Sequence, residues 1–273
     1  MTKSILIACL LLLAAAVPAR AHPGVGIVMD RPGNVFYTDL QHVWRIAPNG
    51  AKSIAVRDVH THELALDAAG NLLGEDSEFL GGDRWRHRVW RRAPDGRVTD
   101  VVPWRDGFWR EYGFVRDAAG ATYWVRCAQR PCTIRKRTPD GRTATFAPGV
   151  RWAGNINWIA AGPDGALYVV DGADLRRVDR AGRATTVARG VGQMMMGMWV
   201  DARSNVYVAV YGARAVMRVA PDGRVATVAR SPAPWGPSGV TVAPNGDLWI
   251  LEYSTSNEAR VRRVARDGRV TVY

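Results

Sequence analysis

The sequence predicts an all-β protein, a six-bladed β-propeller with four antiparallel strands per blade. Three observations lead to this prediction. Short apolar runs rich in β-branched residues follow one another along the chain after residue 21, and turn signals separate them. Two such turns recur in each of six units. The turn glycines of the second kind lie 46, 45, 41, 41 and 45 residues apart, at Gly50, Gly96, Gly141, Gly182, Gly223 and Gly268. Repetition near this period, with four strands per unit, is typical of a propeller.

The last unit shows the pattern most clearly. Its four apolar runs are residues 240–242, 248–251, 261–264 and 270–272. The first turn contains Asn245-Gly246 and the second contains Asp267-Gly268, pairs that tolerate the positive φ of a tight hairpin. A four-stranded sheet cannot bury both faces alone, so we expect the units to stack around an axis. The chain starts with a first strand and ends with a fourth, so side-chain packing between units 1 and 6 must close the ring.

The predicted units cover residues 22–58, 59–104, 105–148, 149–189, 190–230 and 231–273. Large side chains occupy one corresponding place in the second strands, namely Phe36, Leu72, Tyr123, Tyr168, Tyr207 and Trp249. We expect these side chains to pack between neighbouring blades.

Residues 1–21 are predicted to be a signal peptide. Lys3 precedes an apolar stretch over 5–17, and Ala19-Arg20-Ala21 is a small-x-small cleavage site. The stretch is too short to span a membrane. A lipid on Cys9 is disfavoured, because the apolar run continues beyond it. We therefore expect a periplasmic or secreted protein whose domain covers 22–273.

The net charge of +12 comes mainly from arginine, since only three of the 37 basic residues are Lys. The arginines are dispersed and the chain is predicted to be exported, which disfavours nucleic acid as a partner. One arginine follows the second turn glycine in five units, at Arg97, Arg142, Arg183, Arg224 and Arg269. These should ring the face that carries the turns. The ring is either a solvated edge that discourages aggregation or a surface for an anionic partner.

Cys127 and Cys132 are the two cysteines left after the predicted signal peptide, and they flank a hairpin tip. An oxidising compartment favours a disulfide between them. A metal or redox pair is the alternative, although this spacing without other thiols is weak for zinc.

Strand alternation places the loops that link one blade to the next on the face opposite the turns. Polar and aromatic residues of these loops form the predicted ligand site, made of His60, His62, Glu111, Asn155, Asn157 and Trp235. A divalent metal held by His62, Glu63, Glu111 and Asn155 is one interpretation. A lining for a polar ligand and a purely structural role remain the alternatives. Met194–Met196 should plug the axial channel.

Two further features are assigned to that face. Asp39, Asp76, Asp171 and Glu252 end second strands, and they are expected to cap the loops that follow them by accepting backbone N–H bonds. Asp76, with Glu78 beside the insertion, is the best-placed exception. The insertion over 79–88 is expected to overhang the channel mouth.

The repeat resembles the NHL-repeat and gluconolactonase-like (senescence-marker) propellers, and the streptogramin lyases beside them. The segments that carry the resemblance are 235–249, 205–208 and 166–171. It implies a six-bladed ring. Lactone-hydrolysing members hold a divalent cation, usually Ca²⁺, with Glu, Asn and Asp. Asn155 or Asn157 matches the asparagine, whereas Met196 stands in the aspartate place and His22 in the glutamate place. The lyases use a His and Glu pair in late blades, and units 5 and 6 contain no histidine.

The sequence therefore predicts an exported, monomeric propeller that binds a small polar molecule or an envelope partner at the face of the linking loops. A divalent-metal-dependent lactonase is the first alternative. A scaffold that uses the basic rim for protein contacts is the second.

Overall fold

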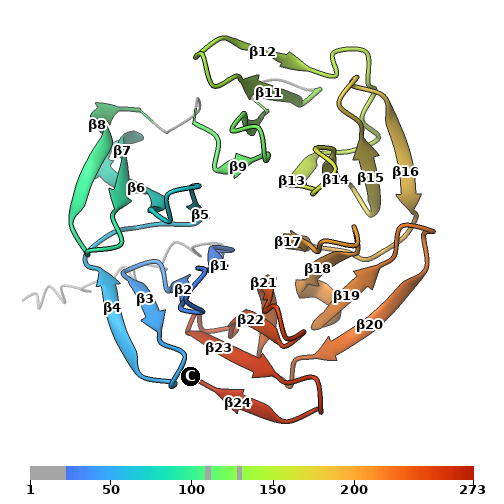
Figure 1. Ribbon diagram of the computed structural model, residues 1–273. Coiled ribbons are helices and arrows are strands. Elements are labelled where there is room, and N and C mark those ends of the chain that lie inside the picture. Colours follow the sequence, from blue (N-terminus) through green and yellow to red (C-terminus); the bar gives the residue numbers. More distant parts are fainter. Residues whose placement is uncertain (1–22, 108–111, 128–130) are drawn as a thin grey trace, which may run out of the picture.

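The computed structural model describes residues 23–107, 112–127 and 131–273. These residues form six four-stranded antiparallel sheets, which stand around a central axis like the blades of a propeller (Figure 1). Every sheet consists of four strands that are consecutive in the chain. The predicted fold is thus confirmed, as is the prediction that the ring closes without an exchanged strand.

The first three blades contain β1 (Ile27–Met29), β2 (Val35–Thr38), β3 (Val43–Ile46), β4 (Lys52–Val56); β5 (Leu64–Leu66), β6 (Leu72–Gly81), β7 (Arg84–Arg92), β8 (Val98–Asp106); and β9 (Val115–Arg116), β10 (Thr122–Arg126), β11 (Thr133–Arg137), β12 (Thr143–Phe146). The first strand of each blade lies at the axis and the fourth lies at the outside (Figure 1).

The last three blades contain β13 (Ile156–Ala161), β14 (Leu167–Asp171), β15 (Asp174–Val178), β16 (Ala184–Ala188); β17 (Met195–Val200), β18 (Val206–Val210), the 3₁₀ turn η1 (Tyr211–Ala213), β19 (Ala215–Val219), β20 (Val225–Arg230); and β21 (Gly236–Val242), β22 (Leu248–Tyr253), β23 (Ala259–Val264), β24 (Val270–Val272). Within the described residues no helix is long and apolar enough to cross a membrane.

The two faces of the ring differ in how the chain turns. On one face, called here the turn face, tight turns join the first strand to the second and the third to the fourth. Gly33 and Gly50 have φ values of +89° and +86° in the two turns of blade 1, a conformation that a side chain disfavours. The opposite face, called here the linker face, carries the loops between blades and between second and third strands.

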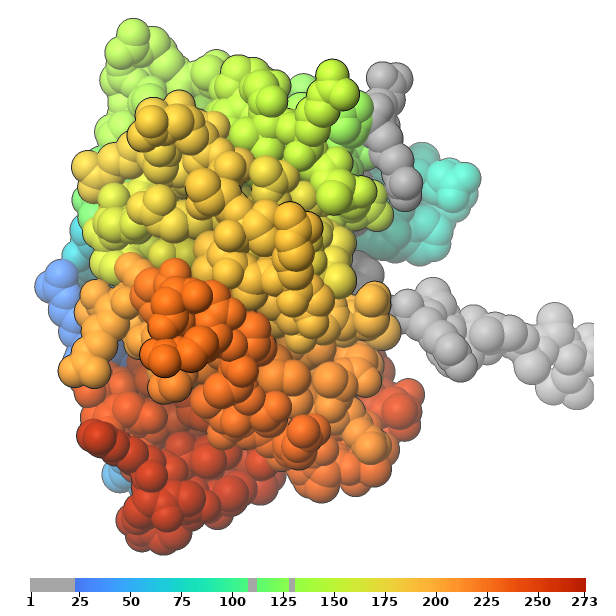
Figure 2. All heavy atoms as spheres, turned by 90° about the vertical axis from the view of Figure 1, so that its right-hand side faces the viewer, coloured from blue at the N-terminus to red at the C-terminus, as the bar shows by residue number. Residues whose placement is uncertain are grey.

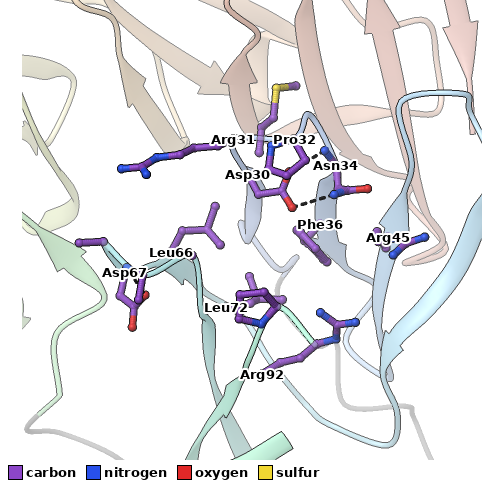
Figure 3. Close-up of a pocket in the computed structure, with 15 residues that line it drawn as sticks. Asp30, Arg31, Pro32, Asn34, Phe36, Arg45, Leu66, Asp67, Leu72 and Arg92 are labelled. Atoms are coloured by element: carbon purple, nitrogen blue, oxygen red, sulfur yellow. Dashed lines mark hydrogen bonds between the residues drawn. The ribbon is translucent and has the colours of Figure 1, made fainter. Parts of the chain in front are cut away.

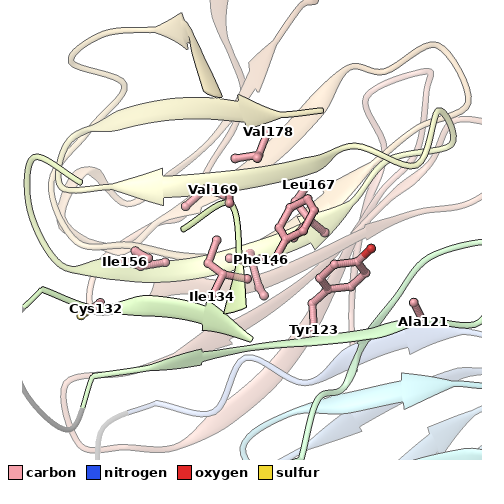
Figure 4. Close-up of a cluster of buried hydrophobic side chains, with 11 residues drawn as sticks. Ala121, Tyr123, Cys132, Ile134, Phe146, Ile156, Leu167, Val169 and Val178 are labelled. Atoms are coloured by element: carbon pink, nitrogen blue, oxygen red, sulfur yellow. The ribbon is translucent and has the colours of Figure 1, made fainter. Parts of the chain in front are cut away.

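The core lies between adjacent blades, where the flat faces of the sheets meet. Figure 4 shows the cluster between blades 3 and 4, in which Tyr123 and Ile134 pack toward Leu167 and Val169. Tyr123 is 2% exposed, and the other three are fully buried. Apolar burial of this kind contributes about 25 cal/mol per Å². The second-strand residue therefore packs between blades, as the sequence predicts.

The insertion over 79–88 does not form a separate overhanging loop. It lengthens β6 and β7 into one hairpin, which stands out from the body on the linker face (Figure 2). The ring of Phe79 packs on Trp85 with centroids 4.9 Å apart near the tip. The extra residues continue the ladder because β6 and β7 stay paired up to Gly81 and Arg84.

Candidate functional site

Glu75 on β6 holds the blade-2 linking loop in place. Its fully buried carboxylate accepts hydrogen bonds from the backbone N–H groups of His62 and Glu63. The Nδ1 atom of His62 lies 3.2 Å from the same carboxylate. Sequence analysis missed Glu75, although an acidic residue within the apolar run over 72–75 was the available signal. Because Glu75 orients this loop, it decides where the neighbouring side chains point.

Glu63 faces the axis of the propeller. It lines an axial cavity of about 140 Å³ whose walls are otherwise apolar and come from the first strands of all blades, for example Val28, Trp158 and Val240. The side chain is half-buried and borders this cavity. Burial, and secondly the carboxylate of Glu75, raise the pKa of Glu63 to about 8. A carboxyl in these surroundings is protonated at neutral pH.

His60 lies apart from Glu63, in a second cavity of about 450 Å³, called here the rim cavity. Asp76, Arg88 and Trp104 also line this cavity. Its Nδ1 is 3.0 Å from the carbonyl oxygen of Leu40, and its ring centroid is 4.7 Å from that of His62. Burial, followed by the nearby His62, lowers the pKa of His60. The neutral ring is therefore favoured at neutral pH.

A larger cavity, called here the mouth cavity, opens on the linker face beside the axis. Its volume is about 650 Å³, and its lining includes Asn155, Asn157, Trp158, Met194–Met196 and Tyr211. Met195 is 2% exposed and belongs to the core between blades 4 and 5, whereas Met194 is 61% exposed. Met194–Met196 thus line the mouth cavity, whereas Gly197, Met198 and Trp199 of the same strand line the axial cavity.

A disulfide joins Cys127 to Cys132 and borders the mouth cavity, with the two Cα atoms 4.3 Å apart. It joins the residue that follows β10 to the residue that precedes β11.

The predicted site residues are not brought together into one cluster. Glu63 lies in the axial cavity, His60 in the rim cavity, and Asn155 and Asn157 in the mouth cavity. Trp235 lines none of these three cavities, and its ring stacks on the guanidinium of Arg260 at 4.0 Å. Glu111 falls outside the described residues.

The predicted metal set fits this arrangement poorly. Among the residues that the structure describes, no three His, Cys, Asp or Glu side chains are grouped so that they could hold a metal ion. The raised pKa of Glu63 makes the loss of its proton, which metal binding requires, costly. The carboxylate of Glu75, near His62, is already engaged by backbone N–H groups.

The acidic residues that end second strands behave in two ways. Asp39 caps the loop that follows it, through the N–H groups of Gln41 and His42. Asp76 and Asp171 instead cap the linking loop that precedes their blade's first strand, Asp76 through His60 N–H at 2.9 Å.

Glu252 departs from the predicted capping role. Its fully buried carboxylate accepts hydrogen bonds from the side chains of Ser231, Arg260 and Arg262, at 2.6, 2.7 and 2.8 Å. The capping prediction failed here because arginines on β23 lie within reach of the carboxylate.

The basic rim of the turn face is locally neutralised. Four of its five arginines pair with an aspartate of their own turn, in the pairs Arg142–Asp140, Arg183–Asp179, Arg224–Asp222 and Arg269–Asp267. All four arginine side chains are more than 80% exposed, and such pairs add little stability. The rim is therefore weaker as an anionic-partner surface than the sequence alone indicated.

Comparison with known proteins supports the fold assignment. No protein-family model matches the chain. A virginiamycin B lyase from Nocardia farcinica is 33% identical over 108 residues, which are 40% of this chain and 37% of that protein. The chain thus matches little more than a third of this relative's length.

Solved structures match over most of the chain. A streptogramin B lyase has a TM-score of 0.59 at 14% identity and covers 91% of this chain and 82% of its own. A gluconolactonase from Xanthomonas campestris has a TM-score of 0.59 at 16% identity, with 83% and 81% covered. Regucalcin, a calcium-binding protein from Agrobacterium tumefaciens, has a TM-score of 0.58 at 21% identity, with 84% and 81% covered. The predicted resemblance is confirmed at the level of the fold: the chain is a six-bladed propeller similar to the streptogramin lyases, gluconolactonases and regucalcins.

Proposed function

We propose that this protein is exported and binds a small, uncharged polar molecule in the mouth cavity on the linker face. One observation carries the proposal. A cavity of about 650 Å³ lies beside the axis, and its described lining contains no Asp, Glu, Lys or Arg. Cavities of this size suit small ligands. A charged ligand would lose its hydration there without gaining a counter-charge.

Two amides supply the polar contacts. Asn155 and Asn157 are exposed in the cavity, and neither side-chain amide forms a hydrogen bond within the described residues. Each amide can donate and accept, which suits hydroxyl and carbonyl groups. Trp158 and Met195 provide an apolar wall on which a ring can rest.

A thermal-shift and calorimetric screen of neutral sugars and sugar lactones tests the proposal. We expect one class to raise the melting temperature of the protein, and Asn157→Ala to weaken its binding about tenfold, because one or two hydrogen bonds are lost. Gln193→Ala is the matched control, since Gln193 lies in the neighbouring loop but does not line the cavity. Equal weakening by both variants, or no binding of any neutral compound, would contradict the proposal.

A divalent-metal-dependent lactone hydrolase is the second candidate. The structural likeness to a gluconolactonase and to a calcium-binding regucalcin favours it. The described donors fit a divalent ion poorly, so we derive no catalytic step through a metal. Hydrolysis of a sugar lactone that requires added Ca²⁺ and is abolished by chelation would favour this candidate over simple binding. Binding of the lactone without turnover, unchanged by chelation, would favour the first.

Export is part of the proposal, and two observations support it. The apolar stretch over 5–17 ends before a cleavage motif, and a disulfide suits an oxidising compartment.

A further inference from the structure

A cation recurs at one register position of the third strand in every blade. The six residues pair across the ladder with the second-strand residues that pack between blades, and they are Arg45, Arg92, Lys136, Arg177, Arg218 and Arg263. Since the position is the same in each blade, the blades serve as controls for one another. How each cation is compensated therefore shows which blades are unusual.

Four of these cations are accommodated locally. Arg177 forms an ion pair with Asp164, and Arg263 forms one with Asp247 at 2.6 Å. Lys136 lies over the ring of Tyr123 at 5.3 Å. Arg218 is exposed to solvent.

Blades 1 and 2 differ in having no carboxylate paired with this cation among the described residues. Arg45 and Arg92 are half-buried, and neither forms an ion pair within the described residues. The Nε atom of Arg45 is buried without a hydrogen-bond partner in the described chain. Arg92 reaches across to blade 1, where its Nε donates to the carbonyl of Ala55 at 3.2 Å and its guanidinium lies over Phe36 at 5.9 Å. Burial, and then the charge of Arg45, lower the pKa of Arg92.

Burial and the charge of Arg45 lower the pKa of Arg92 more than Asp95 and Asp30 raise it, and neither aspartate forms an ion pair with Arg92 among the described residues. Asp30 accepts two hydrogen bonds from Asn34, at 2.7 and 2.8 Å. Asp67 accepts equivalent bonds from Asn71 at 2.9 and 2.8 Å. Both carboxylates close their own turns, whereas Asp164 and Asp247 reach the third-strand arginine of their blade.

A cavity of about 580 Å³ lies between the same two blades on the turn face (Figure 3). Both arginines line it, and so do Asp30 and Asp67, whose carboxylates are held by Asn34 and Asn71. Phe36, Leu66 and Leu72 form its apolar wall. Leu72 occupies the place where the other five blades carry Phe, Tyr or Trp. Because Leu72 is smaller than an aromatic ring, it leaves space between blades that the ring fills at the same position of the other blades.

We propose that this cavity is a binding site for a small organic anion, in which an oxyanion group contacts Arg45 and Arg92 and an apolar body rests against Phe36 and Leu72. Guanidinium groups bind carboxylates and phosphates through short, charge-assisted hydrogen bonds. Two like charges half-buried in one cavity cost desolvation energy, and an anion that contacts both offsets that cost. The site lies on the face opposite the mouth cavity, so it is independent of the function proposed above.

Calorimetric titration of the full-length mature protein at low salt tests this site with three probes. Benzoate combines a carboxylate with an apolar ring, benzamide is its neutral counterpart, and inorganic phosphate lacks the apolar body. We expect benzoate to bind with a Kd below about 1 mM and at least about tenfold more tightly than benzamide or phosphate, because charge and apolar contact both contribute. Equal affinity for benzamide or phosphate, or no benzoate binding, overturns the proposal.

Variants locate the binding. Arg45→Gln and Arg92→Gln should each weaken benzoate at least about tenfold, whereas Arg177→Gln, the equivalent arginine of blade 4, should leave it unchanged. Leu72→Phe restores the ring of the other blades and should abolish binding. Ala68→Trp changes an exposed turn position that also lines the cavity. It should likewise abolish benzoate binding, and it replaces Leu72→Phe as the test if that buried substitution prevents folding. Unchanged benzoate affinity in both cavity-blocking variants places the ligand elsewhere and overturns the proposal.

Discussion

The hydroxyl of Tyr253 on the last blade donates a hydrogen bond of 3.0 Å to the carbonyl oxygen of Thr38 on the first blade, 215 residues earlier in the chain. Both residues are fully buried. Around this bond, Tyr37 and Leu251 share one apolar cluster, and the ring of Tyr273 stacks on Trp249 with centroids 5.4 Å apart. Since no strand is exchanged between these blades, contacts made by side chains, one of them to a backbone carbonyl, join the two ends of the ring.

Tyr253→Phe should lower the free energy of unfolding by about 1–2 kcal/mol, because it removes one buried hydrogen bond and leaves a carbonyl unsatisfied. Tyr37→Phe is the matched control. The hydroxyl of Tyr37 is buried without a hydrogen-bond partner among the described residues, so its removal should be neutral or stabilising. Urea denaturation followed by tryptophan fluorescence measures both. A larger loss for Tyr37→Phe than for Tyr253→Phe would refute this account of ring closure.

Glu252→Leu should destabilise the protein by about 3–5 kcal/mol, since it leaves buried Arg262 without its counter-charge. Removing the exposed partner of a rim pair, as in Asp222→Ala, should cost less than about 1 kcal/mol. Comparing the two variants by chemical denaturation separates a buried ion pair from a solvated one. Similar losses in both would show that the Glu252 cluster is not the stabilising element described here.

Stability should fall as pH rises toward 8. The pKa of Glu63 is about 8 in the folded protein against an ordinary 4.5, so between these values the folded state holds a proton that the unfolded state releases. The free energy of unfolding then decreases with pH, by at most about 1.4 kcal/mol per unit for one proton, and this loss is complete above the folded pKa. The lowered pKa of His60 has the opposite effect, but only below its ordinary value of 6.5.

Melting temperatures between about pH 7 and 8.5 therefore isolate Glu63. Glu63→Gln should abolish most of the pH dependence in this range and stabilise the protein at its upper end. Glu258→Gln, an exposed carboxyl on the same face, should change neither. If Glu63→Gln leaves the change of melting temperature with pH as it is in the parent protein, Glu63 is not the source of that pH dependence.

Reduction of the Cys127–Cys132 disulfide should cost about 2 kcal/mol, as expected from loop-closure entropy for so short a loop. Because this disulfide borders the mouth cavity, the paired Cys127→Ser and Cys132→Ser substitutions should also weaken any ligand of that cavity. They should leave benzoate binding at the turn face unchanged. Thermal melts with and without reductant, together with calorimetry, measure these effects. A loss of benzoate affinity in the double variant would contradict the independence of the two sites.

Expression in a Gram-negative host with an intact leader should yield a periplasmic protein that begins at His22. Mass spectrometry of the intact protein reports the cleavage, and thiol titration under denaturing conditions should find no free cysteine, because Cys9 is removed with the leader and the other two are paired. Recovery of the uncleaved chain in the cytoplasm would count against export.

The spacing of the turn glycines and the two-residue alternation of the strands determined the number of blades, the strand order and the two faces. These are local features, since turn chemistry and strand pairing act between residues that are near in sequence. The same alternation placed Tyr123 between blades correctly. What the alternation could not provide is the direction of a loop side chain, because that depends on partners from other strands.

The candidate sites show where tertiary structure decided the outcome. His60, Glu63 and Asn155 all belong to linking loops, yet they line three different cavities, and the buried carboxylate of Glu75 holds the loop that carries Glu63. The six equivalent third-strand cations are visible in the sequence, but only the fold shows that Arg45 and Arg92 share one cavity while Arg177 and Arg263 meet aspartates. Sequence periodicity therefore determined the ring, and the packing of adjacent blades decided which charges are left unpaired, because that depends on distances between residues far apart in the chain.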